Sequence, residues 1–312
     1  MVEPGVPPVR VGVTPALDLW SRPWAERKAA IDLVADAGID HVFFADHVSF
    51  RAGYGHDGMV LAAGIANLHP TIGMYIGVYL LPLRHPVPVA RQLANLAEMA
   101  PGRISFGVGV GGDDRHEVEV CGVDPATRGR RTDESLEIVT RLLDGEVVDY
   151  EGEFFAMSQA TIVPTPDPRI PVYVGGRADA ALDRAGRHAD GWLGIWSTVD
   201  RYAAALARFD RAAAEAGREV QADHGIQIWV GVDPDAQEAR RRVASAMEGF
   251  YRVPYEKFER YSPFGSPAAI ADYLAPYLEA GCRHFNLTPC ARSPEAGIEA
   301  VAEVAERLRR MG

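Results

Sequence analysis

The chain has 312 residues, of which 47% are hydrophobic and 24% are charged, and its formal net charge is −11. An acidic balance without any basic block of five or six residues argues against nucleic-acid binding. The longest apolar run, residues 71–83, is too short for a membrane-spanning helix. These values indicate a soluble globular protein.

Strand-like and helix-like segments alternate along the chain. Eight segments are short, apolar runs, which is typical of strands that are covered on both faces of a parallel sheet. The predicted strands are Val9–Thr14, His41–Ala45, Thr71–Val78, Ile104–Gly109, Val172–Val174, Trp192–Ile195, Ile226–Val232 and His284–Leu287.

Helices are predicted between these strands, where apolar residues recur every three or four positions. Pro23 near the start of the first helix and Gly38 after its end are typical boundary residues. The predicted helices are Pro23–Ala37, Met59–Asn67, His85–Ala100, Arg130–Leu143, Ala178–His188 and Pro294–Arg309.

Two segments interrupt the alternation. Val147–Tyr150 and Glu153–Phe155, on either side of Glu151-Gly152, are predicted to form a small inserted hairpin. Glu248–Phe264 is aromatic-rich and irregular between two helices, which is typical of a lid over a site.

Eight strands alternating with helices favour an α/β fold of the (β/α)8 type, a TIM barrel, over an open doubly wound sheet. Ala37–Phe44 and Ala280–Leu287 share one pattern of helix end, glycine, polar turn and buried strand. Such a pattern is the joint of a repeating βα unit. No Pro/Gly/Ser-rich linker divides the chain, so a single domain over residues 1–312 is predicted.

Ligands of a (β/α)8 barrel bind at the carboxyl ends of its strands. Asp46 and His47 directly follow the second predicted strand. Histidine is suited to proton transfer near neutral pH, and a neighbouring acid could tune it. A loop-capping aspartate beside a histidine bonded to backbone is the alternative interpretation.

Glycines lie at the ends of two central strands. Gly77 and Val78 lie near the end of the third strand, and the run Gly107–Gly112, with Gly109 and Gly111, ends the fourth. Glycine there lets a flat or anionic ligand approach the backbone. Simple packing between strand and helix is the alternative.

The fifth strand ends in Gly175 and Gly176, and a helix is predicted to begin near Arg177. Free N–H groups at a helix start, together with a guanidinium, form an anion site. A plain tight turn is the alternative. Trp196, at the end of the sixth strand, could line a pocket for a ring.

The cysteines and histidines show no metal or disulfide pattern. Cys121, Cys282 and Cys290 are an odd number without CxxC spacing, and the nine histidines form no clear cluster. The first ten residues lack the apolar core of a signal peptide. We therefore expect a reduced, cytoplasmic location and no metal ion.

Taken together, the chain resembles the luciferase-like monooxygenase superfamily over nearly its whole length. The segments that carry this resemblance, in order, are Leu80–Pro86, Gly102–Gly109, Arg128–Glu134, Tyr150–Phe155 and Pro171–Gly176.

The resemblance implies a (β/α)8 barrel that holds a flavin, or the deazaflavin coenzyme F420, at the carboxyl ends of its strands. It implies a non-proline cis peptide at Gly77–Val78 behind the ring. The Asp-His pair and the short insertion are similar to the F420-dependent branch. The resemblance places the ring at Gly77 and Val78 and the phosphate at Gly175, Gly176 and Arg177. With the residues singled out above, the expected cofactor-binding set is Gly77, Val78, Gly109, Gly111, Gly175, Gly176, Arg177 and Trp196.

One position of the sequence differs from the pattern of the F420-dependent branch. Its sugar-phosphate dehydrogenases carry a glutamate just after the fourth-strand glycines, where this chain has Gly112 followed by Asp113 and Asp114. This difference argues against glucose 6-phosphate as the substrate.

The expected function is hydride transfer between bound coenzyme F420 and a small, mildly apolar organic molecule. His47 is expected to move the proton, and Asp46 to lie near the ring or tune His47; Asp113 and Asp114 are the next candidates. The substrate pocket is expected from Leu17–Pro23, Phe50–Gly58 and Glu248–Phe264.

Three alternatives remain at this point. They are an FMN-dependent monooxygenase using oxygen, a non-catalytic flavin-binding relative, and an unrelated phosphate-binding barrel. A homodimer is expected, together with a separate reductase that supplies reduced cofactor.

Overall fold

The computed structural model describes residues 7–112 and 114–312. Eight parallel strands form the barrel, and β11 pairs with β1 as well as β9, while β9 also pairs with β8, so that the sheet closes. The predicted (β/α)8 fold is confirmed. The strands are β1 (Arg10–Val13), β2 (His41–Phe44), β3 (Gly73–Leu80), β4 (Ile104–Gly109), β7 (Val172–Gly175), β8 (Gly191–Ile195), β9 (His224–Val232) and β11 (Cys282–Cys290).

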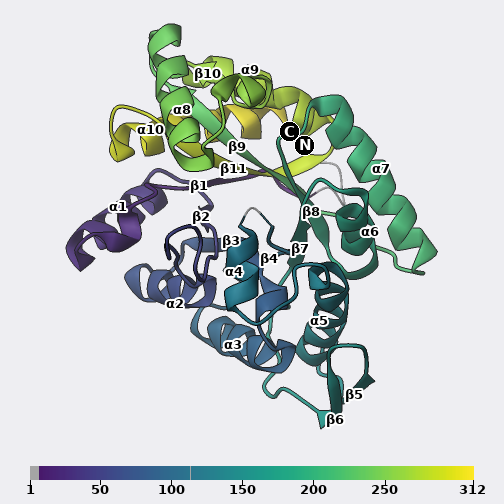
Figure 1. The fold of residues 1–312 in the computed structure, drawn as a ribbon. Coiled ribbons are helices and arrows are strands. Elements are labelled where there is room, and N and C mark those ends of the chain that lie inside the picture. The colour runs from purple at the N-terminus through teal and green to yellow at the C-terminus, as the bar shows by residue number, and fades with distance from the viewer. Residues whose placement is uncertain (1–6, 113) are drawn as a thin grey trace.

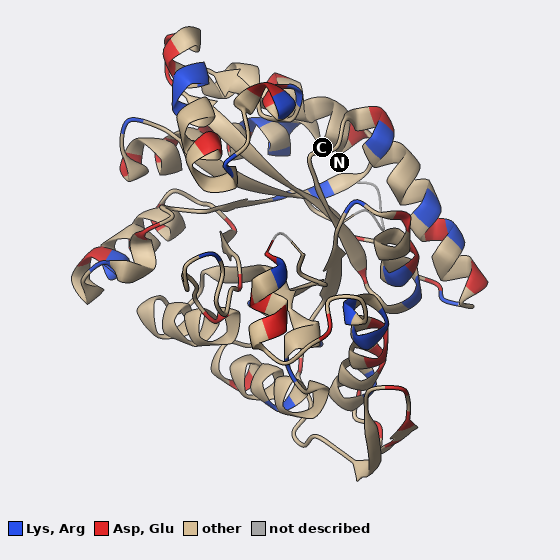
Figure 2. Ribbon diagram, viewed as in Figure 1, with Lys and Arg blue, Asp and Glu red and all other residues tan. Residues whose placement is uncertain are grey.

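Helices surround the strands (Figure 1). Most of the charged residues lie on these peripheral helices and in loops, and the central strands carry few of them (Figure 2). The helices are α1 (Trp24–Asp36), α2 (Gly58–Leu68), α3 (Pro86–Met99), α4 (Arg115–Val120), α5 (Arg128–Leu143), α6 (Asp179–His188), α7 (Val199–Glu215), α8 (Ala236–Tyr251), α9 (Pro267–Glu279) and α10 (Pro294–Met311). Among the described residues, none of the helices is long and apolar enough to cross a membrane.

The strands are buried on both faces because helices cover the outside and side chains fill the inside. Every residue of β2 is buried. The inside holds polar as well as apolar groups. His41 Nε2 and Asn286 Oδ1 lie 2.6 Å apart, and His284 Nε2 and Asp223 Oδ2 also lie 2.6 Å apart.

The inserted hairpin differs from its predicted boundaries. Its strands are β5 (Val148–Glu151) and β6 (Ala156–Ala160), so Glu153–Phe155 forms the turn and not the second strand. The cause is Glu134 on α5, whose carboxylate accepts hydrogen bonds from the backbone N–H groups of Glu153, Phe154 and Phe155 at 2.7, 3.0 and 3.2 Å. Three donors held by one acid keep these residues in the turn.

The predicted lid, Glu248–Phe264, is partly helical. α8 continues to Tyr251, and two 3-10 turns, Tyr255–Lys257 and Glu259–Tyr261, follow it. β10 (Phe264–Gly265) then adds a short parallel strand beside β9. The aromatic residues of this segment thereby reach the mouth of the barrel from α8.

Candidate functional site

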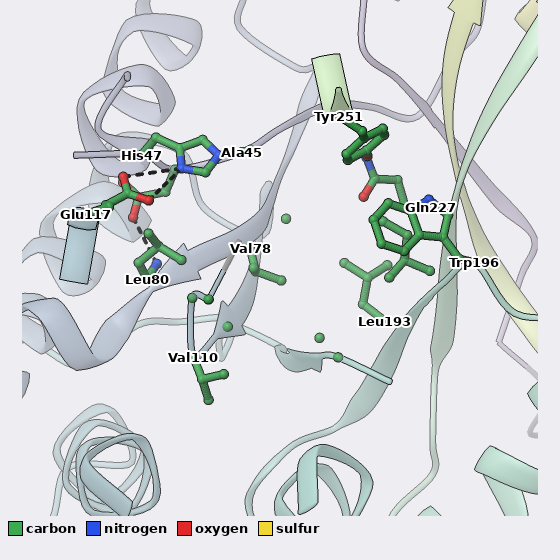
Figure 3. A pocket seen from close by; sticks show the side chains of 18 of the residues that line it. Ala45, His47, Val78, Leu80, Val110, Glu117, Leu193, Trp196, Gln227 and Tyr251 are labelled. Atoms are coloured by element: carbon green, nitrogen blue, oxygen red, sulfur yellow. Dashed lines mark hydrogen bonds and ion pairs between the residues drawn. The ribbon is translucent and has the colours of Figure 1, made fainter. Parts of the chain in front are cut away.

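The carboxyl ends of the strands enclose a cavity of about 260 Å³, called the main cavity below (Figure 3). It collects side chains and backbone from β2, β3, β4, β7 and β8, as expected for this fold. Nine of the ten predicted site residues line it: Asp46, His47, Gly77, Val78, Gly109, Gly111, Gly175, Gly176 and Trp196.

The side chain of Val78, on β3, packs against glycines of β4 and β7 at the base of the main cavity. The Gly77–Val78 peptide is cis, as the resemblance implied. A Cβ atom at Gly109 would lie 2.3 Å from Val78 Cγ2, and one at Gly175 would lie 2.6 Å from Val78 Cγ1. Gly77 is required for another reason, because a Cβ there would lie 2.1 Å from the Phe43 ring. Each of these glycines therefore leaves room for a neighbouring side chain, either Val78 or Phe43.

Asp46 forms a buried ion pair and no hydrogen bond with His47, which corrects the expected tuning of His47 by Asp46. Its carboxylate accepts from Arg84 Nη1 at 2.5 Å and Nη2 at 2.8 Å, and from the N–H groups of Gly58 and Leu80 at 2.9 Å each. Burial raises the pKa of Asp46 above its ordinary value, although Arg84 and the N–H groups of Leu80 and Gly58 act in the opposite direction. Asp46 therefore fastens the end of β2 to β3 and to the start of α2.

The acid that contacts His47 is Glu117, on the six-residue helix α4. Its Oε2 lies 3.1 Å from His47 Nδ1, and its Oε1 accepts from the N–H groups of Val48 and Ser49 at 2.7 and 3.1 Å. Burial would raise the pKa of Glu117, but the hydrogen bonds with His47, Val48 and Ser49 outweigh burial and lower it.

This contact fixes the tautomer of His47. A carboxylate only accepts hydrogen bonds, so Nδ1 carries the hydrogen and the other ring nitrogen, Nε2, remains for a ligand. The ring also stacks on Phe50, with centroids 4.3 Å apart. Figure 3 shows His47 and Glu117 on one side of the main cavity, opposite Trp196, Gln227 and Tyr251.

The opposite wall is aromatic. Trp196 has a φ of 47° and packs edge-on against Tyr251, with centroids 4.9 Å apart. Arg177 does not line the main cavity, because its guanidinium lies over the Trp196 ring, 4.9 Å from the centroid. Its positive charge is thereby held at the edge of the cavity beside Gly176.

The start of α6 offers backbone donors at this edge. Its N-cap residue, Ala178, has no side-chain acceptor, and a Cβ at Gly176, where φ is 134°, would lie 2.8 Å from Ala181. The first N–H groups of a helix without a cap bind anions. The predicted anion site at Gly175, Gly176 and Arg177 is therefore compatible with the geometry.

Asp114, one of the two other acidic candidates, is engaged in backbone contacts. Asp114 caps α4 by accepting from the His116 N–H at 3.0 Å, and it accepts from the Arg51 N–H at 2.7 Å. Asp113 lies outside the described residues. Within the described part of the chain, histidine, cysteine and acidic side chains form no group that could hold a metal ion.

Sequence reasoning missed Glu117 and Gln227, which line the main cavity, whereas Phe250 and Tyr251, which also line it, belong to the segment Glu248–Phe264 expected at the substrate pocket. One feature of the sequence could have indicated Glu117. Asp114 precedes it by three residues, which is typical of the start of a helix, and the first turn of that helix would lie close to the glycine run. No feature of the sequence indicated a role for Arg51, although its guanidinium donates hydrogen bonds to the carbonyl groups of Phe250 and Tyr251. These bonds tie the loop after β2 to the end of α8.

Comparison with known proteins identifies the family. Residues 8–308 match the model of the luciferase-like monooxygenase family. The chain belongs to this family and is an enzyme.

Two curated relatives are similar over part of the chain. One is an uncharacterised protein of Mycobacterium tuberculosis, 36% identical over 198 residues, which are 63% of this chain and 68% of that protein. The other is named F420-dependent glucose-6-phosphate dehydrogenase, from Nakamurella multipartita. It is 32% identical over 197 residues, and the match spans 60% of this chain and 56% of that relative.

Two solved structures share the fold. One is an F420-dependent secondary alcohol dehydrogenase in complex with an F420–acetone adduct, with a TM-score of 0.84 and 20% identity over 97% of this chain and 99% of that one. The other is the oxygenating constituent of 3,6-diketocamphane monooxygenase from Pseudomonas putida in complex with FMN, with a TM-score of 0.76 and 16% identity over 97% of this chain and 99% of that one.

Proposed function

We propose that the protein is an F420-dependent oxidoreductase that transfers a hydride between coenzyme F420 and a small organic substrate. The observation that carries the proposal is His47, held by Glu117 at the edge of a glycine-lined cavity with one ring nitrogen free. The named relative from Nakamurella multipartita, which is F420-dependent, supports the choice of cofactor.

The residues present fit a flat ring with a phosphate tail. Gly77, Val78, Gly109 and Gly175 line the base of the cavity, against which the ring would lie. Trp196 closes one side, and its indole Nε1 is buried without a partner. The donors at Gly176 and the start of α6, with Arg177, would hold the phosphate.

The chemistry is divided between cofactor and protein. A deazaflavin ring, when bound, exchanges a hydride at a ring carbon. His47 Nε2 is placed to take a proton from a substrate hydroxyl, or to return it to a carbonyl oxygen. Glu117 keeps the ring in the productive tautomer and stabilises the imidazolium that proton transfer creates, as the acid of a catalytic triad does. Phe250 and Tyr251 line the same cavity and limit access of water.

Titration of the purified protein with each cofactor tests the proposal. Ring fluorescence should show binding of coenzyme F420 with a Kd below ~1 μM and much weaker binding of FMN. Tight binding of FMN instead would favour the reduced-flavin monooxygenase, and binding of neither would refute a cofactor enzyme. A homodimer and a separate F420 reductase remain part of the proposal.

Removal of the positive charge of Arg177 tests where the phosphate of the cofactor binds. Arg177→Ala should weaken F420 binding by about 1.5–3 kcal/mol, the range for a charged hydrogen bond. Arg187→Ala is the matched control, since Arg187 lies on α6 and pairs with Asp133 at 3.5 Å, away from the cavity. Equal affinities of the two variants would place the phosphate elsewhere.

A further inference from the structure

The last turn of α8 forms one wall of the main cavity. Phe250 and Tyr251 end this helix, and both line the cavity. The helix ends where Arg252 adopts a left-handed conformation, with a φ of 56°. The last carbonyl groups of a helix have no donor within the helix, so those of Phe250 and Tyr251 need donors from elsewhere in the molecule.

Arg51, on the loop after β2, supplies these donors. Its guanidinium donates from Nη1 to the Phe250 carbonyl, and from Nη2 to the Tyr251 carbonyl at 3.4 Å. A cation is favoured at this end of a helix, because the helix dipole places negative charge there. Arg51 therefore attaches the loop to a helix end that lies 199 positions further along the chain.

The position of Arg51 is itself fixed by its surroundings. Its N–H donates to Asp114 Oδ2 at 2.7 Å, and Asp114 caps α4. The backbone groups of Phe50 and Tyr54 exchange hydrogen bonds at 2.7 and 2.8 Å, which closes the loop around Arg51. Arg51 and Ala52 have positive φ values of 33° and 40°, which non-glycine residues adopt where the surrounding contacts hold them.

An aromatic stack connects this loop to His47. The Phe50 ring stacks on the His47 ring, with centroids 4.3 Å apart, and on the Phe250 ring, with centroids 6.2 Å apart. The Arg51 guanidinium lies 4.8 Å from the centroid of Phe50, a contact that is attractive for a cation. Arg51 thus contacts the stack through Phe50 and the wall through the Phe250 carbonyl.

A further cavity, called the outer cavity below, lies beside this wall and has a volume of about 340 Å³. Phe250 lines both the outer cavity and the main cavity, so its side chain lies at the boundary between them. Besides residues of the loop after β1, the outer cavity is lined by Phe50, Arg51, Tyr54, Gly249, Phe250 and Arg252.

We propose that Arg51 is a positioning residue that holds the last turn of α8 closed over the main cavity, and that release of its two hydrogen bonds joins the main cavity to the outer cavity. Hydrogen bonds of this kind are strong enough to favour the closed wall. They are also weak enough to break during the motions that admit and release ligands of enzymes.

The closed wall keeps water away from the space proposed for the cofactor ring. In this respect the inference rests on the proposed function. The positioning of α8 by Arg51 does not depend on which ligand the main cavity binds, so it can be tested on the protein alone.

Hydrogen exchange of the protein without cofactor tests the position of the wall. Arg51→Gln should accelerate exchange of the Phe250, Tyr251 and Arg252 amides about three- to tenfold, as expected for the loss of hydrogen bonds that close this turn. The amides of residues 240–246, earlier in α8, should keep their wild-type rates. Unchanged exchange at the helix end, or acceleration along the whole of α8, would overturn the inference.

Release of coenzyme F420, followed by stopped-flow ring fluorescence, tests the consequence for the main cavity. Arg51→Gln should raise the dissociation rate about three- to tenfold. Iodide should also quench the fluorescence of the bound cofactor more strongly than in the wild type, because the open wall admits solvent. Dissociation and quenching equal to those of the wild type would show that Arg51 does not close the cavity.

Two further variants complete the test. Arg252→Gln is the matched control, since Arg252 lines the same outer cavity but is exposed, and it should leave dissociation and quenching unchanged. Arg51→Lys covers the case in which Arg51→Gln does not fold. Lysine keeps the charge but lacks the fork of the guanidinium, so its dissociation rate should lie between those of wild type and Arg51→Gln. Effects of Arg252→Gln as large as those of Arg51→Gln would attribute the change to charge alone.

The two proposals fail in different ways. If the wild type does not bind coenzyme F420, the proposed function fails, and hydrogen exchange still decides whether Arg51 positions the wall. If coenzyme F420 binds and Arg51→Gln changes neither its release nor the exchange at the end of α8, only the inference about Arg51 fails.

Discussion

At the residue scale, His47 acts through a contact that is not adjacent in sequence. Asp46 is its neighbour in the chain, yet the carboxylate that reaches Nδ1 belongs to Glu117, seventy positions away. Successive residues at a strand end point in different directions, so two neighbours need not share a site. The acid of the site comes instead from α4, the short helix that follows β4.

His47→Ala should reduce kcat by about 10²–10⁴-fold, because it removes the group proposed to move the proton. Cofactor affinity, followed by ring fluorescence, should change little. Glu117→Gln should reduce kcat less and leave KM nearly unchanged, because it weakens the support of the ring without removing it. Wild-type turnover in His47→Ala would refute the assignment.

Asp46→Asn should destabilise the fold by about 3 kcal/mol, since it leaves the partly buried Arg84 without its nearest counter-charge. Asp57→Asn is the control. Asp57 also pairs with Arg84, at 2.9 Å, but its side chain is 41% exposed, and asparagine preserves its cap on α2. Urea unfolding should show the larger loss for Asp46→Asn; equal losses would contradict the buried-pair interpretation.

At the scale of elements, the sequence predicted the eight strands and most of the helices, with ends shifted by a few residues. The helices α1, α2, α3, α5, α6 and α10 correspond to predicted ones, whereas no range was predicted for α7, α8 and α9. α4 has only six residues, too few for a periodic signal, and it carries Glu117. The substrate pocket was expected from three segments alone, whereas the cavity of about 100 Å³ that they line is also walled by Leu61 of α2 and Trp229 of β9.

The hairpin turn depends on a single acid of α5. Glu134→Ala should free the N–H groups of Glu153, Phe154 and Phe155, and their hydrogen exchange should accelerate. Glu137→Ala is the control on the same helix, where Glu137 pairs with Arg141 at 3.6 Å. Exchange rates in the turn that are equal for the two variants would show that Glu134 does not hold it.

At the scale of the whole molecule, buried histidines couple stability to pH. His41, His188 and His224 each have a pKa lowered to about 4, chiefly because burial disfavours the charged ring. The unfolded chain binds protons to them near pH 6.5. Between pH 6.5 and 4 the unfolded state therefore holds more protons, and stability falls as pH falls through this window.

The free energy of unfolding should decrease from pH 7 to pH 4.5, with His41 contributing up to about 3 kcal/mol. His41→Gln should flatten this dependence, whereas His116→Gln, at an exposed position on α4, should leave it unchanged. Urea unfolding at several pH values measures the difference. A dependence equally steep in His41→Gln would exclude His41 as a cause.

The side chain of Val78 lies against Gly109 of β4 and against Gly175 of β7. A methyl group cannot be added at either glycine while valine stands at 78. A descendant of this protein that gains alanine at 109 or 175 must therefore first acquire a smaller residue at 78. The base of the cavity thus imposes an order on the substitutions by which lineages of this barrel can diverge.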